Sequence, residues 1–593
     1  MKFTQALKAV QGVAPDSQRY DVLLGCGFTS LHLQTFLAAH LVQRVPGRRP
    51  HIRTGLYGDV AGTLESVRSN DQFDAIAVAL EWFDLDPRLG YRSAGAWNSV
   101  SDLLASARTM LARIGAAIER LPSGIPVAIS LPTLPLPPVF SPAGWQASQA
   151  ELELQKVVLN FAASASVRRA CGIVNPVSMA RKSAPADRYD FKSDLSAGLP
   201  YTLAHADAVG EALAQLLAPP APKKGIITDL DDTLWSGIVG EVGPENVSWD
   251  LAGHAQLHGL YQKLLSTLAG EGVLVAIASK NDPAVASRAL ERNDLLLRRQ
   301  EIFPQAISWN SKSGAVSRIL ETWNVGADSV VFIDDSPMEL AEVSSAHPSV
   351  ECILFPKADP AAGYTLLHRL RDLCGKPRVS EEDALRLESI RQGAAFRDAE
   401  SGGIAPEEFL RQAGAVVTFD FDGVAEDARA LELVNKTNQF NLNGRRIAEN
   451  DWQARLSRAS AVAATIAYQD RFGPLGKISV LQGEKQGNVL VLETWVLSCR
   501  AFARRIEFQC LKTLFDRYDI QVIELAFVPT SKNGPTRDLL SALGLKTASS
   551  GEERPALSRR QFDEFCPALC HEVKVAGLMT SIGEGNSKTT WTL

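Results

Sequence analysis

The sequence has no long apolar run and few cysteines. The first absence disfavours a membrane-spanning helix, and the second disfavours a metal site built from cysteine pairs. No stretch of the chain's 593 residues reaches the ~18 to 20 apolar residues that span a bilayer. The N-terminal residues also lack the continuous apolar core of a signal peptide. The eight cysteines form no CxxC pair, and the only suggestive spacing, Cys566, Cys570 and His571, has no second ligand pair beside it. We therefore expect free thiols, a cytoplasmic location and no membrane partner.

A strong charge of either sign is missing as well. The net charge is −6 with a pI near 6.0, so nothing favours nucleic acid as a partner. A composition of 46% hydrophobic and 22% charged residues is that of an ordinary globular protein. Because 593 residues are too many for one core, the length predicts about three to five domains.

Residues 1–218 alternate apolar runs with amphipathic stretches. The expected strands are residues 20–25, 74–80 and 125–131, and the expected helices are residues 99–121 and 145–169. Such alternation predicts an α/β domain with a parallel sheet covered by helices.

The order and spacing of these elements resemble the SGNH-hydrolase type of fold. That family places a nucleophilic serine just after the first strand and a histidine near the C-terminus. Here the first loop, from Gly25 to Ser30, reads Gly-Cys-Gly-Phe-Thr-Ser, and a late block carries His205. The family's Gly-Asp-Ser motif is absent. We therefore expect a flavodoxin-like or SGNH-like domain with a docking or structural role, in which His205 is as compatible with packing or capping as with a base.

A proline-rich segment, residues 218–224, stiffens the chain and separates this domain from the next. The apolar run 225–228 then ends in Asp229 and Asp231, which alternation along a strand would place on the same side. Clustered carboxylates repel one another unless a cation neutralises them, and Mg²⁺ prefers such oxygen ligands. From these residues alone, a solvated acidic turn remains the alternative.

Three later features extend this pattern. The apolar run 272–278 ends in Ser279, Lys312 follows, and the run 329–333 ends in Asp334 and Asp335. In a parallel α/β sheet, sites form where the carboxyl ends of the strands meet. The sequence therefore predicts one site built from two acidic strand ends, a hydroxyl and a lysine.

In this order, these residues resemble the haloacid dehalogenase (HAD) superfamily of phosphohydrolases. The resemblance implies that Asp229 is the nucleophile that takes the phosphoryl group and that Asp231 is the general acid/base. It also implies that Ser279, Lys280 and Lys312 hold the phosphoryl oxygens. The alternative is an inert domain that carries the pattern by chance.

The resemblance further implies a Mg²⁺ site made by the Asp229 carboxylate, the Asp231 backbone carbonyl and Asp334, with Asp335 near it. A cation and a lysine would cancel the repulsion between a carboxylate nucleophile and an anionic phosphate. The stretches that follow Asp229 and Ser279 are too short for a large cap domain. A capless core implies an open site that accepts large substrates or is covered by other domains.

The segment Asp229–Glu241, which reads DLDDTLWSGIVGE, narrows the resemblance to the FkbH-like branch (HAD-IIIC). Members are described as glyceryltransferase/phosphatases of polyketide and related natural-product biosynthesis. They take 1,3-bisphosphoglycerate, form a glyceryl thioester, remove the phosphate and pass glyceryl to an acyl carrier protein. The resemblance thus implies two partners, a phosphorylated three-carbon metabolite and the phosphopantetheine arm of a carrier. Many relatives carry a cysteine just before the motif serine, whereas this chain has Ala278.

Residues 377–404 are expected to be a helical linker, residues 405–578 an α+β domain and residues 579–593 a tail. The expected strands of the α+β domain are residues 463–468, 476–482, 488–495 and 521–527. The segment Lys436–Leu442, KTNQFNL, resembles the acetyltransferase-like (GNAT) region of the FkbH-like family. The usual glycine-rich phosphate turn is replaced by Ala503, Arg504 and Arg505, which disfavours acetyl-CoA and leaves carrier-bound pantetheine as the expected ligand.

Cys499 is the candidate acyl-carrying thiol, because neighbouring cations such as Arg500 raise the thiolate fraction of a cysteine. The alternative is a small buried hydrophobe at a strand end. The residues expected to contact the acyl group or the carrier are Lys436, Asn438, Asn441, Arg500, Lys532 and Asn533. Two further functions stay open: a plain Mg²⁺-dependent phosphatase acting on another phosphometabolite, and a non-catalytic scaffold of an assembly line.

Overall fold

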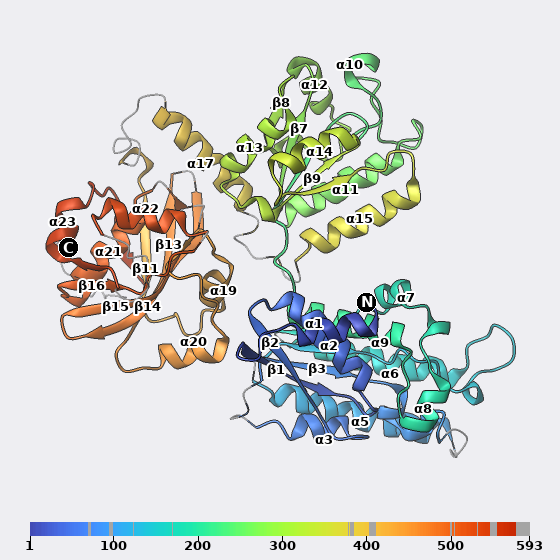
Figure 1. Ribbon diagram of the computed structural model, residues 1–593. Coiled ribbons are helices and arrows are strands. Elements are labelled where there is room, and N and C mark those ends of the chain that lie inside the picture. The colour runs from blue at the N-terminus through green and yellow to red at the C-terminus, as the bar shows by residue number, and fades with distance from the viewer. Residues whose placement is uncertain are drawn as a thin grey trace, which may run out of the picture. The chain divides into compact units, whose positions relative to one another are not determined.

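The computed structural model describes most of the chain. The described residues are 1–68, 71, 73–93, 99–122, 124–168, 170–376, 379, 383, 385–401, 411–471, 473–498, 501–502, 504–530, 532–545 and 554–576; of residues 395–401 and 428, only the backbone is considered. The chain divides into two compact units, Met1–Pro220 and Ala221–Leu593. We call the first unit the N-terminal domain. Within the second, residues 222–376 are the central domain and the described residues of 411–576 the C-terminal domain (Figure 1).

The N-terminal domain is built on a parallel sheet with the strand order β2-β1-β3-β4-β5. The strands are β1 (Gln18–Gly25), β2 (Arg48–Thr54), β3 (Ala75–Ala79), β4 (Val127–Ser130) and β5 (Cys171–Ile173). This is the flavodoxin-like order, which agrees with the parallel α/β domain that the sequence predicts. The prediction missed β2 and β5, because one is a polar edge strand and the other has only three residues.

Helices cover both faces of this sheet, so the domain has two cores. They are α1 (Phe3–Gln11), α2 (Leu31–Arg44), α3 (Val60–Glu65), α4 (Trp82–Leu85), α5 (Val100–Arg120), α6 (Gln149–Ser166), α7 (Pro176–Lys182), α8 (Phe191–Ala197) and α9 (Leu203–Leu217). One core takes its helical residues mainly from α1, α2 and α9, with Met179 of α7, and the other mainly from α3, α5 and α6, with Trp82 and Leu85 of α4. A capping box starts α6, since the Glu151 N–H donates to Ser148 Oγ and the Ser148 N–H donates to Glu151.

The central domain has a second parallel sheet, with the strand order β10-β9-β6-β7-β8. The strands are β6 (Gly225–Thr228), β7 (Leu274–Ser279), β8 (Ile302–Ile307), β9 (Val330–Asp334) and β10 (Glu351–Leu354). Strands β6, β7 and β9 are buried along their whole length, as expected for strands covered on both faces.

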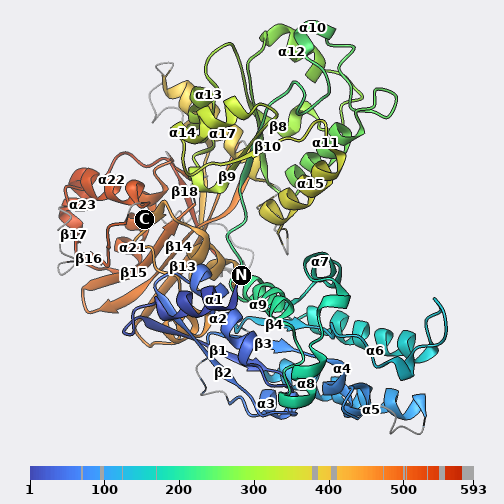
Figure 2. The ribbon, with the colours of Figure 1, turned by 45° about the vertical axis from the view of Figure 1, so that its right-hand side comes forward.

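Two layers of helices cover this sheet. They are α10 (Val239–Val242), α11 (Gln256–Gly270), α12 (Pro283–Leu290), α13 (Lys312–Trp323), α14 (Pro337–Ala346), α15 (Pro360–Cys374) and α17 (Arg386–Ser401). Helices α11 and α15 lie side by side on one face (Figure 1, Figure 2). On the other face α13 and α14 pack together, and Ile390 of α17 is buried in the same core. Part of the expected linker therefore packs on the central domain.

No cap domain covers the carboxyl edge of this sheet from within the stretch 229–312, every residue of which is described. That stretch contains loops, short turns, strands β7 and β8 and helices α10, α11 and α12, with no further sheet. The expectation of a capless core is confirmed for these residues.

The C-terminal domain is a mixed α+β unit, as the sequence predicts. Its strands are β11 (Val416–Asp420), β12 (Phe440–Asn441), β13 (Ala461–Asp470), β14 (Gly473–Gln486), β15 (Val489–Leu497), β16 (Val522–Leu525), β17 (Ala556–Ser558) and β18 (Glu572–Val575). They form the order β17-β16-β15-β14-β13-β11-β18, and β12 pairs with β15. The pairs β15–β16 and β11–β18 are parallel and the others antiparallel. The four strands expected from the sequence correspond to β13, β14, β15 and β16.

Helices again cover both faces of this sheet. They are α19 (Ala428–Lys436), α20 (Glu449–Leu456), α21 (Ile506–Tyr518), α22 (Gly534–Ala542) and α23 (Arg559–Phe565). Buried residues of α19 and α20 form one core, and those of α21, α22 and α23 form the other. Among the helices that the structure describes, none is long and apolar enough to cross a membrane.

Candidate active site

The carboxyl edge of the central sheet brings together the four features that the sequence singles out. Thr228 is in register with Ile277 of β7 and Ile333 of β9, so Asp229 emerges between the ends of these two strands. The Asp229 N–H donates to the Ile333 carbonyl at 3.0 Å, which places Asp229 beside Asp334. Parallel pairing thus gathers residues that are more than a hundred positions apart.

Lys312, the first residue of α13, lies between two of these carboxylates. Its Nζ is 2.8 Å from Asp229 Oδ2 and 2.6 Å from Asp334 Oδ2. Lys312 is 4% exposed, Asp229 6% and Asp334 0%, so this charged triad is shielded from water. Buried charges need such partners, because an isolated buried ion is costly.

Burial and charge act on the triad in opposite directions. Burial raises the pKa of both Asp229 and Asp334, and Lys312 opposes that rise. Burial also lowers the pKa of Lys312, but the two carboxylates outweigh it, so the pKa of Lys312 is raised overall. The lysine therefore stays an ammonium ion at neutral pH.

One carboxylate oxygen of the triad is left without a cation or a hydrogen-bond donor among the described residues. Asp229 Oδ1 is buried and has no hydrogen-bond partner among the described residues. Ligand atoms of Asp229, Asp334 and Asp335 all lie within 4.8 Å of one another. Carboxylate oxygens are the donors that Mg²⁺ prefers. The donor set and the unpartnered oxygen fit a divalent cation at this edge.

Asp231 is held on both of its oxygens. The Trp235 indole N–H (2.9 Å) and the Val239 N–H (3.0 Å) donate to Oδ1, and Asn281 Nδ2 donates to Oδ2 at 3.0 Å. The same Asn281 nitrogen donates to Ser279 Oγ at 3.1 Å, so one amide orients two residues of the predicted site. Asn281 is 5% exposed and Trp235 0%, so neither can easily take another position.

Sequence reasoning gave Asn281 and Trp235 no role, although Trp235 lies in the segment DLDDTLWSGIVGE and Asn281 is two residues after Ser279. The available signal was an amide two residues after the motif serine.

Lys280, the third residue expected to hold phosphate, pairs with two glutamates in this structure. Its Nζ lies 2.9 Å from Glu339 and 3.6 Å from Glu342, both on α14. Its role in phosphate binding stays a prediction.

The described residues expected to contact an acyl group or carrier all have partners within the protein. Cys499 and Arg500 lie outside the described residues. Lys436 pairs with Glu432 one helical turn away, and the Asn438 side chain accepts a hydrogen bond from Arg446. The Lys532 N–H donates to Thr530 Oγ1.

Asn441 and Asn533 are 2% and 0% exposed, and the side chains of both stabilise loops through hydrogen bonds to the backbone. Asn441 Oδ1 accepts from two backbone N–H groups of the following turn, and Asn533 Nδ2 donates to the Asn441 and Val528 carbonyls. Their contact with a carrier stays a prediction, because their amides are already occupied in loop hydrogen bonds.

The segment that contains Asn441 fills a gap in the C-terminal sheet. Strands β15 and β16 pair only as far as Leu492 and Leu525, and β12 then pairs with the far end of β15. Asn443 Nδ2 donates to the carbonyls of Glu493 (2.9 Å) and Ala526 (3.4 Å), which bridges the two strands. Strand β12 and the following Asn443 therefore complete the sheet at this point.

In the N-terminal domain, His205 is a packed residue. It is 0% exposed, and its two ring nitrogens lie 2.8 Å from Thr133 Oγ1 and 2.9 Å from Ser183 Oγ. Burial lowers the pKa of His205 to about 3. Ser30 stands at the N-cap of α2. This arrangement agrees with the structural interpretation of His205 rather than with a hydrolase base.

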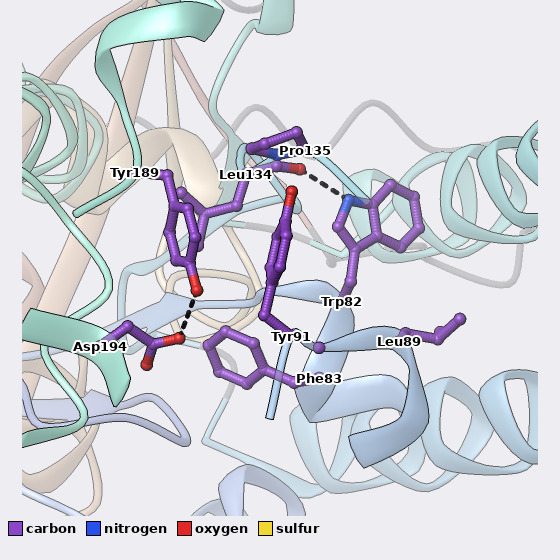
Figure 3. Close-up of a pocket in the computed structure, with 9 residues that line it drawn as sticks. Trp82, Phe83, Leu89, Tyr91, Leu134, Pro135, Tyr189 and Asp194 are labelled. Carbon is purple, nitrogen blue, oxygen red and sulfur yellow. Dashed lines mark hydrogen bonds between the residues drawn. The ribbon is translucent and has the colours of Figure 1, made fainter. Parts of the chain in front are cut away.

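A small aromatic cavity lies at the carboxyl edge of the same sheet (Figure 3). Its lining residues are Trp82, Phe83, Leu89, Gly90, Tyr91, Leu134, Pro135, Tyr189 and Asp194. The rings of Tyr91 and Tyr189 are stacked, and the Tyr189 hydroxyl donates to Asp194 at 2.7 Å. The cavity volume of about 10 Å³ holds at most a single water molecule, so it cannot take a substrate as it stands.

Comparison with known proteins finds a solved structure whose fold is similar over most of the chain. No protein-family model matches the sequence, and no curated protein matches it either. Among solved structures, the chain is similar to the N-terminal part of the protein BF1531 from Bacteroides fragilis, which contains a phosphatase domain and was solved complexed with Mg. The identity is 20%, the TM-score is 0.51, and the match covers 63% of this chain and 98% of that one. The two chains share a fold. The match is far longer than the central domain alone.

Two further likenesses are shorter. One is to an uncharacterized protein from Corynebacterium glutamicum, with 15% identity, a TM-score of 0.19 and coverage of 26% of this chain and 98% of that one. The other is to a domain from Methanocaldococcus jannaschii, with 11% identity, a TM-score of 0.20 and coverage of 24% and 97%. TM-scores this low carry no functional argument.

Proposed function

We propose that the chain is a Mg²⁺-dependent phosphoryl-transfer enzyme of the HAD type, with Asp229 as its nucleophile. The observation that carries this proposal is the buried Asp229–Lys312–Asp334 triad, in which one Asp229 oxygen has no partner among the described residues. The likeness to a phosphatase-containing chain solved with Mg supports it.

The residues that would hold Mg²⁺ are Asp229, Asp334 and Asp335. The HAD resemblance adds the backbone carbonyl of Asp231. When bound, Mg²⁺ supplies positive charge that offsets the charge of the phosphate. Lys312 supplies a second, permanent positive charge at the same place, and Ser279 offers a hydroxyl donor to a phosphoryl oxygen.

The reaction then follows from the positions of two carboxylates. An Asp229 oxygen attacks phosphorus, the bond from phosphorus to the leaving oxygen breaks, and Asp231 gives that oxygen a proton. Water next attacks the phosphorus of the aspartyl phosphate, Asp231 takes a proton from the water, and phosphate leaves with Asp229 restored. Asn281 and Trp235 hold Asp231 for both steps.

Asn281→Ala tests this positioning role. The variant removes the donor to Asp231 Oδ2 and to Ser279 Oγ, and hydrogen bonds to charged groups contribute about 1.5–3 kcal/mol. We expect kcat for a chromogenic phosphate monoester to fall about ten- to hundredfold with little change in KM. Asn293→Ala, an exposed amide in the same domain, is the control. An unchanged kcat in Asn281→Ala would remove this residue from the account.

We further propose that the complete reaction of the chain is the transfer of a glyceryl group to a carrier protein. A thiolate of the chain would attack C1 of 1,3-bisphosphoglycerate and expel phosphate, which leaves a phosphoglyceryl thioester. The Asp229 site would hydrolyse the remaining phosphate ester, and the thiol of a carrier arm would take the glyceryl group by thioester exchange. The FkbH-like motifs and the capless stretch 229–312 support this proposal, because an open site can admit a thioester carried on a protein.

The two alternatives make different demands on the structure. A plain phosphatase acting on another phosphometabolite needs only the Asp229 site. A non-catalytic scaffold needs no site at all, and the buried triad argues against it, because buried ion pairs are weak contributors to stability.

The state of the described thiols bears on which cysteine could carry the acyl group. Burial raises the pKa of six of them: Cys26, Cys171, Cys352, Cys374, Cys510 and Cys566. A raised pKa lowers the thiolate fraction and with it the reactivity. Of the eight cysteines, this leaves Cys499 and the partly exposed Cys570, and Cys499 is the proposed acyl carrier.

Cys499→Ala is expected to abolish a hydroxylamine-labile glyceryl adduct on the protein while phosphate release from a simple monoester continues. The measurement is the intact mass after incubation with 1,3-bisphosphoglycerate and Mg²⁺. Cys352→Ala, which removes a partly buried thiol of the central domain, should keep the adduct. An undiminished adduct in Cys499→Ala would show that another thiol carries the group.

One incubation separates the proposed function from both alternatives. The protein is mixed with Mg²⁺, 1,3-bisphosphoglycerate and a holo acyl carrier protein, and both proteins are weighed. Glyceryl mass on the carrier supports transfer, and phosphate release without an adduct supports the plain phosphatase. If neither occurs, the scaffold is supported. Chelation of Mg²⁺ should stop release of the second phosphate, the ester that the Asp229 site hydrolyses.

A further inference from the structure

A second lysine, Lys357, lies at the rim of the candidate metal site. Its Nζ is 2.9 Å from Asp335 Oδ2 and 2.7 Å from Asp232 Oδ2. Asp335 is one of the three carboxylates that could hold a divalent cation. Unlike Lys312, the Lys357 side chain is 46% exposed, so its ammonium group can move without a large desolvation cost.

A backbone hydrogen bond ties the loop that carries Lys357 to the end of β9. It follows β10, and the Phe355 N–H donates to the Asp334 carbonyl at 2.8 Å, which ties this loop to the end of β9. The loop therefore presents the lysine stem to the acidic edge, and the position of the ammonium group is decided by its two carboxylate partners.

Asp232 is the partner that does not belong to the metal cluster. It has a φ of 51°, and its Oδ1 accepts the Gly237 N–H at 2.8 Å, so the turn holds its carboxylate in place. Lys357 is thus shared between a fixed carboxylate outside the cation cluster and one inside it.

We propose that Lys357 competes with the divalent cation for Asp335 and so sets the cation affinity of the site, with Asp232 holding the displaced ammonium group. This inference rests on the proposed Mg²⁺ site. An ammonium group at hydrogen-bond distance occupies one Asp335 oxygen and repels an incoming cation. When the cation binds, the lysine loses one carboxylate and keeps the other, which limits the cost of displacement.

The test is a double-mutant cycle read by Mg²⁺ binding to the full chain, measured by isothermal titration calorimetry. Lys357→Gln should bind Mg²⁺ about three- to tenfold more tightly, because Asp335 is then free. Asp232→Asn should bind it more weakly, because Lys357 then has only Asp335 as a partner. Asparagine tolerates a positive φ, so the turn at position 232 is retained.

The double variant separates competition from a general effect of charge. With Lys357 absent, Asp232→Asn has no lysine to redirect, so it should change the Mg²⁺ affinity little. A pure charge effect would weaken binding equally in both backgrounds, and that result would overturn the proposal. A merely structural ion pair would make both single variants bind more weakly, which would also overturn it.

Lys223→Gln is the matched control for net charge. Lys223 precedes β6 and pairs with Glu351 at the amino end of the sheet, away from the site. It should leave the Mg²⁺ affinity unchanged; an increase equal to that of Lys357→Gln would overturn the proposal. If the wild-type chain binds no Mg²⁺, the proposed metal site itself fails, whereas normal wild-type binding with an unchanged Lys357→Gln refutes only the role of Lys357.

Discussion

Asp229→Asn is expected to abolish Mg²⁺-dependent phosphate release while the protein stays folded. The amide cannot act as the nucleophile, and the loss of a covalent nucleophile lowers kcat by a factor on the order of 10⁴ or more. Stability should change little, because Lys312 keeps Asp334 as its partner at 2.6 Å. Burial already disfavours the ionised form of Asp229, so its removal also relieves an unfavourable charge.

The measurement for Asp229→Asn pairs phosphate release with urea unfolding of the same preparation. Asp372→Asn, at an exposed position on α15, is the control and should keep full activity. Residual activity within about tenfold of wild type in a folded Asp229→Asn protein would place the nucleophile elsewhere.

Lys312→Met should have the largest effect on stability. It removes the only lysine that contacts both Asp229 and Asp334 among the described residues, and it leaves two buried carboxylates without their cation. Breaking a buried ion pair from one side costs about 3–5 kcal/mol. We expect the free energy of unfolding of the central domain to fall by that amount without Mg²⁺, and phosphate release to be lost.

Added Mg²⁺ should restore part of this lost stability, because a cation at the same carboxylates takes over the compensation that Lys312 provides. Urea unfolding of Lys312→Met with and without Mg²⁺ measures the difference. Lys263→Met, at an exposed position on α11, should show neither effect. A Lys312→Met protein as stable as wild type in chelator would contradict the buried triad.

The central site could be predicted from the sequence because its residues sit directly at strand ends. Asp229, Ser279 and Asp334 each follow an unbroken apolar run, and the parallel sheet forces such ends together. Lys312 does not directly follow a strand, and only its place before the third apolar run linked it to the other three residues; its phosphate-binding role came from the family resemblance. The structure places it between two of them.

The residues that orient this site could not be assigned from sequence. Asn281 and Trp235 act through hydrogen bonds to Asp231, and Lys357 acts through Asp335, more than twenty positions away. Asn281 lies 50 positions from Asp231, so its contact depends on which loops meet at the sheet edge. Trp235 is only four positions from Asp231, but its place in the sequence does not show where its indole N–H points.

In the C-terminal domain, the sequence suggested a binding role for residues that the structure shows in structural hydrogen bonds. The polar segment around Asn441 looks like a binding motif in the sequence, yet its amides hydrogen-bond to neighbouring backbone and bridge β15 to β16. Asparagine side chains serve both purposes equally well, because they offer a donor and an acceptor to a ligand or to a loop. Only burial distinguishes the two uses, and burial at a loop is not visible in a sequence.

The central claim, that Asp229 takes the phosphoryl group, is tested most directly by trapping the aspartyl phosphate. The full chain is mixed with Mg²⁺ and a phosphate donor labelled with ³²P, quenched in acid and digested. We expect a hydroxylamine-labile label on the peptide that contains Asp229, and no label in Asp229→Asn. A label on a different residue, or phosphate release from Asp229→Asn at the wild-type rate, would contradict it.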